Sequence, residues 1–201
     1  MTSFWDSIHS LDQAYTLFMN GLGGSTFNSF MIFMSDVKVW FPLYALIVAM
    51  LIWKLGWKKG LISVVCLALC LLACDQTSNL LKYSVGRLRP CYSETMVSGG
   101  LSILEKRGGL FGFFSAHSAN AFGLALCSTI CLRNASGFNH KIWGWGIFIW
   151  AALVAISRVF VGKHYIGDIV VGMGFGLLWG YAIATIAVKL IFPVISTRRK
   201  A

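Results

Sequence analysis

The chain has 201 residues, of which 57% are hydrophobic and only 12% are charged, and its mean hydropathy is +0.73. Soluble domains carry about 25% charged residues, so this composition excludes an ordinary soluble protein and predicts a single membrane-embedded domain over residues 1–201. The net charge is +10, but the basic residues are divided among short loops between hydrophobic segments, which argues against nucleic acid as a partner.

The first predicted element is an amphipathic helix over residues 4–18, within an N-terminal segment of residues 1–25. Its apolar side chains share roughly one face, while acidic residues such as Asp6 and Asp12 lie elsewhere. This pattern is typical of a helix that lies in the membrane interface. The stretch GLGGS then ends the helix. No basic region followed by an apolar stretch is present, so we expect no cleaved signal peptide.

The next segment, residues 26–35, is apolar but too short to span a membrane, because a spanning helix needs about 20 residues. It forms either an interfacial turn of helix or an extension of the next span. Five spans follow, at residues 39–55, 60–81, 111–132, 142–161 and 165–191. The predicted fold class is therefore an all-α integral membrane protein, a bundle of about five to six transmembrane helices with an N-terminal interfacial helix.

Small residues recur at helical spacing inside the spans. Gly172, Gly176 and Gly180 repeat every four residues in the last span, which predicts close packing against another helix. Cysteines have the same four-residue spacing in two other spans, and no Cys-x-x-Cys pair is present. We therefore expect packing roles for the cysteines and no structural zinc.

The basic residues predict the orientation of the spans. The loops 54–60 and 133–141 and the tail residues 198–200 carry Lys and Arg without an acidic residue, and five spans place all three on one side. The positive-inside rule makes this side cytoplasmic. The opposite, outer side receives the N-terminal helix, the polar segment 82–110 and the turn around residues 157–168.

Three polar clusters reach the outer side. The stretch KYSVGRLRP ends the second span, FFSAHS begins the third, and SRVFVGKHYIGD joins the fourth to the fifth. Between one cluster and the next, the chain crosses the membrane an even number of times. All three clusters therefore lie on the same side and can meet in one pocket. Their basic side chains include Lys82, Arg89, Arg158 and Lys163. Such cations repel one another unless an anion satisfies them, and Arg and Lys both suit phosphate oxygens. The clusters therefore predict a binding site for a phosphate group that is carried on a membrane molecule.

Two histidines in these clusters predict catalysis. His164 and Asp168 are four residues apart, so they share a helix face if the fifth span starts near Tyr165. The carboxylate then accepts the proton of one ring nitrogen and leaves the other nitrogen free to act as a nucleophile or base. His117 comes from another span and can protonate the leaving group. Two histidines with opposite roles suit phosphoryl transfer through a phosphohistidine.

The three clusters resemble, in order, the signature motifs of the type 2 phosphatidic acid phosphatase family. That pattern is Lys-x6-Arg-Pro, then Pro-Ser-Gly-His, then Ser-Arg-x5-His-x3-Asp. The first and third motifs match in every defined residue. The second departs from the pattern at Phe114 and Ala116, while Ser115 and His117 remain. The motifs cover residues 82–168, and the helical layout extends the resemblance over most of the chain.

The resemblance implies a metal-independent phosphatase without a cofactor, built as a helical membrane core. It implies that His164 is the nucleophile, that Asp168 orients it, and that His117 protonates the leaving oxygen. The residues that it implies for binding the phosphate are Lys82, Arg89, Arg158, Ser115 and, through backbone amides near His117, Ala116.

Size and chain layout are similar to those of bacterial family members that act on lipid A phosphates, isoprenyl diphosphates, phosphatidylglycerol phosphate or phosphatidate. We expect a phosphate on lipid A or a similar glycolipid as the substrate, at the outer, periplasmic face of a bacterial inner membrane. Undecaprenyl diphosphate is the close rival, and no motif separates the two. The segment 83–110 and the helix 4–18 border the pocket and should shape this choice.

Two alternative functions, from other classes of protein, remain possible on the sequence alone. A phospholipid transporter or anion-binding membrane protein would keep the cations but would not need His117 opposite His164 and Asp168. A halide-oxidising vanadium enzyme has a pocket that resembles this family's phosphate site, but the membrane embedding argues against it.

Three polar residues outside the motifs have open roles. Arg87 reaches either the phosphate or the lipid headgroups. Asp75 and Asn79, four residues apart inside the second span, favour a hydrogen bond between helices over a functional role. Glu105 lies either in a lid over the site or, as we expect, in an exposed charged turn.

Overall fold

The structure is a computed structural model that describes residues 4–197, and every regular element within this range is a helix. The elements in chain order are α1 (Phe4–Gly21), α2 (Ser25–Ser35), η1 (Val37–Trp40), α3 (Phe41–Leu55), α4 (Trp57–Val85), η2 (Pro90–Tyr92), α5 (Glu94–Ser98), α6 (Ala116–Leu132), α7 (His140–Phe160), α8 (Ile166–Ile186), η3 (Ala187–Ile191) and α9 (Phe192–Thr197).

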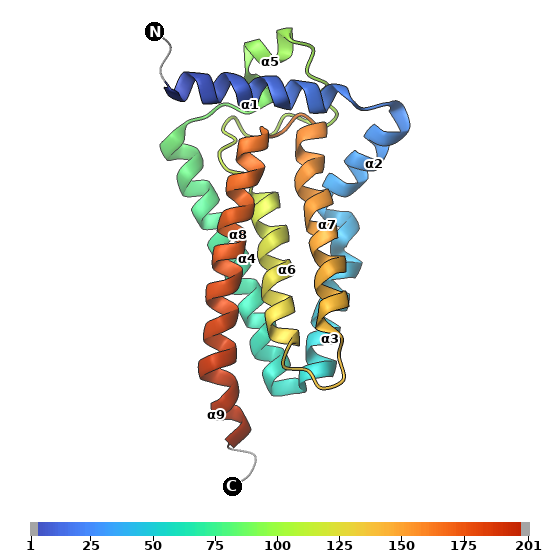
Figure 1. The fold of residues 1–201 in the computed structure, drawn as a ribbon, viewed down its shortest axis with the longest axis vertical. Coiled ribbons are helices and arrows are strands. Elements are labelled where there is room, and N and C mark those ends of the chain that lie inside the picture. The colour runs from blue at the N-terminus through green and yellow to red at the C-terminus, as the bar shows by residue number, and fades with distance from the viewer. Residues whose placement is uncertain (1–3, 198–201) are drawn as a thin grey trace.

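The helices form the predicted all-α membrane bundle (Figure 1). The helical segments that are long and apolar enough to cross a membrane are Val37–Leu55, Trp57–Val85, His140–Phe160 and Ile166–Ile195. The shorter apolar helix α6 packs against α4, α7 and α8. Most of its side chains are buried by these neighbours. Because α6 is surrounded by protein, it can hold polar residues such as Ser118 and Ser128, which a lipid-facing helix would not tolerate.

The predicted start of the third span, residue 111, is wrong by five positions, because α6 begins at Ala116. The preceding apolar residues are not helical, and the first of them pair with the segment that follows α4. The backbone N–H of Gly112 donates to the carbonyl of Arg87 at 2.9 Å, and that of Arg89 donates to the carbonyl of Leu110 at 3.0 Å. Ser115 then caps α6 by accepting a hydrogen bond from the N–H of Ser118.

The glycine face of α8 packs directly on the backbone of α6. A Cβ atom on Gly172 would lie 2.6 Å from the carbonyl oxygen of Ser115, and one on Gly180 would lie 2.7 Å from that of Gly123. At Gly176 a Cβ would overlap the carbonyl oxygen of Ala119. These glycines therefore set the distance between α6 and α8, which fixes how the polar ends of the two helices meet.

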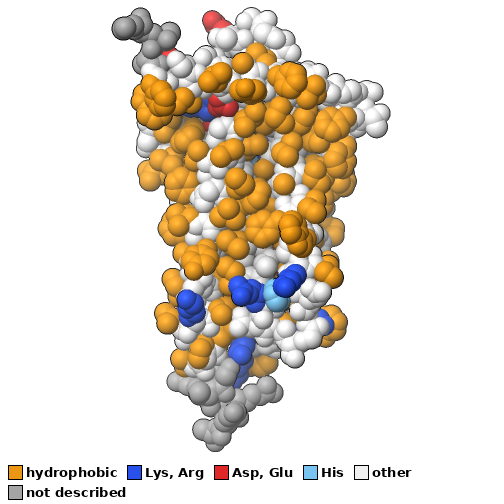
Figure 2. All heavy atoms as spheres, viewed as in Figure 1, with side chains coloured by type: hydrophobic (Ala, Val, Ile, Leu, Met, Phe, Trp, Pro, Cys, Tyr) orange, Lys and Arg blue, Asp and Glu red, His pale blue; other side chains and the backbone are white. Residues whose placement is uncertain are grey.

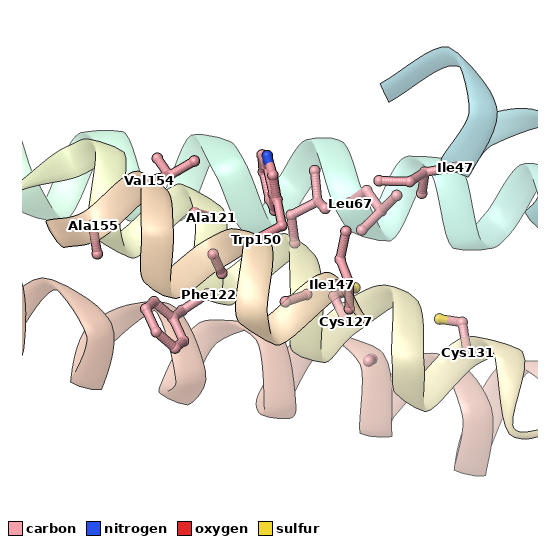
Figure 3. Packing of buried hydrophobic residues seen from close by; sticks show 14 of the residues in the cluster. Ile47, Leu67, Ala121, Phe122, Cys127, Cys131, Ile147, Trp150, Val154 and Ala155 are labelled. Carbon is pink, nitrogen blue, oxygen red and sulfur yellow. The ribbon is translucent and has the colours of Figure 1, made fainter. Parts of the chain in front are cut away.

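Buried apolar side chains from α3, α4, α6 and α7 fill the middle of the bundle. Figure 3 shows Leu67 of α4 and Trp150 of α7 beside the α6 residues Ala121 and Cys127. All six cysteines are buried and free in the structure, which agrees with their predicted packing role.

Helix α1 lies across one end of the bundle (Figure 1), and the residues that it buries are polar. Phe4 and Trp5 are 72% and 74% exposed, whereas Thr16 and Asn20 are 0% and 2% exposed. Asn20 is fixed by hydrogen bonds to the carbonyl of Phe160 at 2.9 Å and from the N–H of Ser102 at 2.7 Å. The apolar face is therefore free to meet the membrane interface, as the sequence predicts.

Hydrophobic side chains cover most of the visible face of the bundle, and Lys and Arg side chains gather near the end opposite α1 (Figure 2). That end holds the α3–α4 and α6–α7 connections, whose basic residues guided the predicted orientation. The tail residues 198–200, which belong to the same prediction, lie outside the described range.

Candidate active site

The turn between α7 and α8 presents His164. Its backbone N–H and that of Lys163 both donate to the carbonyl of Arg158, at 3.2 and 3.0 Å. Gly162 permits this tight turn because its φ is +75°, a conformation that other residues rarely adopt. The turn therefore holds His164 immediately before α8, whose first turn contains Asp168.

The predicted contact between His164 and Asp168 is present. Nδ1 of His164 lies 3.3 Å from Oδ2 of Asp168, and both side chains are buried. The same Oδ2 accepts a hydrogen bond of 3.1 Å from the backbone N–H of Tyr165. Because an ionised carboxylate only accepts, the arrangement assigns the proton to Nδ1 and leaves the lone pair on Nε2.

Burial lowers the pKa of His164 from its ordinary 6.5 to about 4, although the hydrogen bond and charge of Asp168 act in the opposite direction. Nearby Arg158 and Arg89 lower this pKa further. The imidazole is therefore neutral at physiological pH, which is the protonation state that a nucleophile requires.

The predicted cationic residues converge on the same region. Arg158, Arg89, Lys82 and His164 all lie close enough to His117 to act on it electrostatically. Arg158 is buried and donates to the Ser35 side chain, and its Nη1 lies 3.5 Å from Oε2 of Glu105. Its Nε has no hydrogen-bond partner among the described residues, so the guanidinium still has a donor to offer.

Arg89 and Lys163 meet at the turn around Gly108. The Nε of Arg89 donates to the carbonyl of Phe111 at 3.1 Å. A Cβ on Gly108 would lie 3.2 Å from Nη1 of Arg89 and 3.5 Å from Nζ of Lys163. The segment between α5 and α6 thus borders the cationic cluster, and a larger residue at 108 would crowd it.

The residues of the second motif lie at the N-terminus of α6. Ser115 is fully buried, and its N–H donates to the carbonyl of Asp168 at 3.1 Å. This bond ties the start of α6 to the first turn of α8. Ala116 follows with negative φ, since only glycines among the described residues have positive φ. The alanine therefore needs no backbone conformation that only glycine adopts.

Arg87 lies against Asp168. Its Nη1 donates to Oδ1 of Asp168 at 2.8 Å, and its Nη2 donates to Oδ2 of Asp12 at 2.7 Å. The guanidinium also stacks over the ring of Tyr165, 3.9 Å from the ring centroid. The structure thus gives Arg87 a contact with Asp168 that neither role considered from the sequence, phosphate binding or headgroup contact, had included.

Side chains of α1 cap the first turn of α8, which sequence reasoning missed. Oδ1 of Asp12 accepts from the N–H of Gly167 at 2.9 Å, and Oγ1 of Thr16 accepts from the N–H of Ile166 at 3.1 Å. A signal was present in the sequence, because Asp12, Thr16 and Asn20 are spaced by four and so form one polar helix face.

A cavity of about 560 Å³ opens beside His117 and Ser35 and extends between α3, α4, α6 and α7. Most of its lining is apolar, including Trp40, Leu67 and Val154. The histidine thus lies at the junction between the cationic cluster and an apolar space inside the bundle.

No three His, Cys, Asp or Glu side chains between residues 4 and 197 lie close enough together to hold a metal ion. Of the acidic residues near the site, Asp12 and Asp168 form ion pairs with Arg87, and Glu105 forms one with Arg158.

A comparison with family models matches residues 61–192 to the PAP2 superfamily. The chain belongs to this family. The resemblance seen in the three motifs is therefore confirmed, and with it the predicted class of enzyme, a phosphatase.

Two curated relatives are similar to this chain over most of their length. A lipid A 4'-phosphatase of Bacteroides thetaiotaomicron is 36% identical over 91% of this chain and 80% of its own. A lipid A 4'-phosphatase of Porphyromonas gingivalis is 30% identical over 87% of this chain and 72% of its own. The apolar helices and these relatives identify a bacterial multi-pass membrane protein.

Two solved PAP2 structures share the fold. A transmembrane phosphatidylglycerolphosphate phosphatase of Bacillus subtilis has a TM-score of 0.75 at 22% identity, covering 93% of this chain and 89% of its own. LpxE of Aquifex aeolicus has a TM-score of 0.63 at 20% identity, covering 86% of this chain and 93% of its own.

Proposed function

We propose that this protein removes a phosphate from a lipid A-type glycolipid, without a metal ion, through a phosphohistidine. The observation that carries the proposal is the buried contact of 3.3 Å between His164 and Asp168, in a site that also gathers His117 and several cations. The two lipid A 4'-phosphatases support the choice of lipid, since they cover most of this chain.

In the proposed first step, Nε2 of His164 forms a bond to phosphorus as the bond between phosphorus and the lipid oxygen breaks. His117 donates its proton to that leaving oxygen. Asp168 stabilises the positive charge that develops on the ring of His164. In the second step His117 takes a proton from water, the water oxygen bonds to phosphorus, and the bond from phosphorus to nitrogen breaks.

The cations hold the phosphoryl oxygens in this proposal. Lys82, Arg89 and Arg158 neutralise the charge that spreads over these oxygens in the transition state. The amides at Ala116 and His117 assist them, because the first N–H groups of a helix have no partner within the helix. Ser115 supports these amides as the cap of α6.

We place the site at the periplasmic face of the inner membrane. The basic connections lie near the end of the bundle opposite α1 (Figure 2), and the positive-inside rule assigns that end to the cytoplasm. The end that holds His164 then faces outward, with α1 lying in the outer interface.

The test is phosphate release by the purified protein in detergent with EDTA present. The lipids are lipid A, undecaprenyl diphosphate, phosphatidylglycerol phosphate and phosphatidate. We expect release from lipid A, loss in His164→Ala, and retention in His140→Ala, which changes a histidine at the start of α7, away from the site. Full activity in His164→Ala, or activity that depends on added magnesium, would contradict the mechanism. Preferential release from another lipid would contradict the proposed substrate.

A further inference from the structure

A polar pair interrupts the apolar wall of the cavity beside His117. Nδ2 of Asn120, on α6, donates a hydrogen bond of 2.9 Å to Oδ1 of Asp75, on α4. Both residues line the cavity. The interhelical hydrogen bond expected for Asp75 is therefore present, but its partner is Asn120, whereas Asn79 is exposed on the outside of α4.

The pair keeps unused hydrogen-bonding capacity: besides the second N–H of the Asn120 amide, two of its oxygens are free to accept. Oδ1 of Asn120 is buried without a partner in the part of the chain that the structure describes. Its amide cannot be turned over without placing that oxygen against the carboxylate of Asp75. Oδ2 of Asp75 also accepts no hydrogen bond from the described residues, although it is not one of the fully buried atoms. Placing a carboxylate inside a membrane protein costs free energy. A hydrogen bond that served only to link α4 to α6 would need just one of the two carboxylate oxygens.

The position of the pair relates it to the leaving group. Asn120 lies one helical turn after His117 on α6, and both residues line the same cavity. Asp75 is also close enough to Lys82 for the two charges to interact. The pair therefore lies between the cationic cluster and the apolar part of the cavity, beside the place where a lipid oxygen would receive its proton from His117.

We propose that Asp75 and Asn120 form a subsite for a hydroxyl or amide N–H group on the leaving lipid, next to the phosphoester oxygen. This inference rests on the proposed function and names the chemistry that selects its substrate. An N-acylated amino sugar carries such donors on the carbons around its phosphoester. The diacylglycerol of phosphatidate offers only ester acceptors, and a polyprenyl chain offers hydrocarbon.

The subsite therefore predicts discrimination by hydrogen-bond donors. A donor on the sugar satisfies acceptors that are otherwise unpaired, whereas a lipid without one leaves them unsatisfied within a low-dielectric cavity. Neighbouring apolar residues, such as Leu67 and Trp150, hold the remaining hydrocarbon in both cases and so do not discriminate.

The experiment compares kcat/KM for lipid A and for phosphatidate in the wild type, Asp75→Asn and Asn120→Ala. We expect both variants to lower kcat/KM for lipid A by about 10- to 100-fold, the range for a lost charge-assisted hydrogen bond, and to change phosphatidate less than threefold. Asn79→Ala is the matched control, since it removes a polar side chain from the exposed face of α4, and we expect it to change neither value.

Folding of each variant is checked by its melting temperature with and without vanadate, a phosphate mimic whose binding should need the cationic cluster but not the leaving lipid. Some variants will still be stabilised by vanadate. If kcat/KM in these variants falls equally for both substrates, or does not fall for lipid A, the proposed subsite is wrong. A variant that vanadate no longer stabilises would also overturn it, because the pair would then be required for the fold. A wild type that releases no phosphate from lipid A but does so from phosphatidate would refute the proposed substrate instead.

Discussion

Arg87 donates a hydrogen bond of 2.8 Å to Oδ1 of Asp168, while Oδ2 of the same carboxylate lies 3.3 Å from Nδ1 of His164. Each oxygen of Asp168 thus has its own fixed partner, so the carboxylate cannot rotate without breaking a bond. Asp12 anchors Arg87 from the other side at 2.7 Å. The orientation of His164 depends through this chain of contacts on a helix that lies outside the bundle.

Replacing Arg87 tests this dependence. We expect Arg87→Gln to lower kcat by about 10- to 100-fold, because it removes a charge-assisted hydrogen bond to Asp168, and to leave KM within about twofold, because Arg87 lies outside the cationic cluster. Steady-state kinetics on the best lipid substrate measure both. Arg133→Gln, in the α6–α7 connection, is the control. An increase in KM at unchanged kcat would indicate that Arg87 binds the phosphate directly.

The pH dependence of kcat/KM should report His164 on its acidic side. Its pKa lies at about 4 because of burial, and only the neutral ring is a nucleophile. Activity that depends on His164 should therefore persist well below pH 6.5 and fall only as the pH approaches 4. A profile for the wild type between pH 3.5 and 8 checks this, and an acidic limb centred near 6.5 would contradict it.

The same shift predicts how stability depends on pH. The unfolded chain binds a proton at His164 near pH 6.5, but the folded protein does not until about pH 4. The unfolded state thus binds more protons in this window, so the contribution of His164 to stability is full above pH 6.5 and is lost as the pH falls towards 4. Melting temperatures of the wild type should fall more steeply across this window than those of His164→Gln.

Glu105 lies beside the guanidinium of Arg158, which the proposed mechanism assigns to phosphate binding. Its Oε2 lies 3.5 Å from Nη1 of Arg158, so a bound anion must displace or oppose this carboxylate. We expect Glu105→Gln to tighten inhibition by vanadate about two- to fivefold, because a partly exposed ion pair is worth about 0.2–1 kcal/mol. Glu94→Gln, at the start of α5, serves as the control. Weaker inhibition would mean instead that Glu105 holds Arg158 in its binding position.

Two glycines of α8 form a matched pair for stability. A Cβ on Gly176 would overlap the backbone of α6, whereas one on Gly174 meets no atom within 4 Å. We expect Gly176→Ala to destabilise the protein by about 1–3 kcal/mol, as overpacking does, and Gly174→Ala to be neutral or slightly stabilising. Melting temperatures in one detergent check this, and equal effects would show that α6 and α8 do not depend on this contact.

Local spacing made the centre of the candidate site predictable. The separation of four between His164 and Asp168 correctly predicted their contact, because α8 begins at Ile166, one residue from the expected start. The glycine face of the last span was also predictable, since its repeat depends only on helical geometry. Both features follow from short-range periodicity, which a single sequence records directly.

Long-range contacts were not predictable in the same way. Residues 111–115 are largely apolar but not helical: Phe113 and Phe114 form a bend, and backbone hydrogen bonds tie Gly112 to Arg87 and Ser115 to Asp168. The amphipathic pattern of the first helix indicated two faces without indicating which one meets the bundle. The partners of Arg87 and Asp75 come from other helices, and no spacing rule connects such positions.

The contact between Asp12 and Gly167 joins positions 155 residues apart, and this separation has a consequence for synthesis. A ribosome makes α1, α4 and α6 well before α8, so a partly translated chain already holds Lys82, Arg89 and His117 in the membrane. It lacks His164 and Asp168, however, and the polar side chains of α1 have no helix to cap. Under the proposed mechanism, His164 is thus oriented only when the last span inserts, and a chain stalled before that point should release no phosphate.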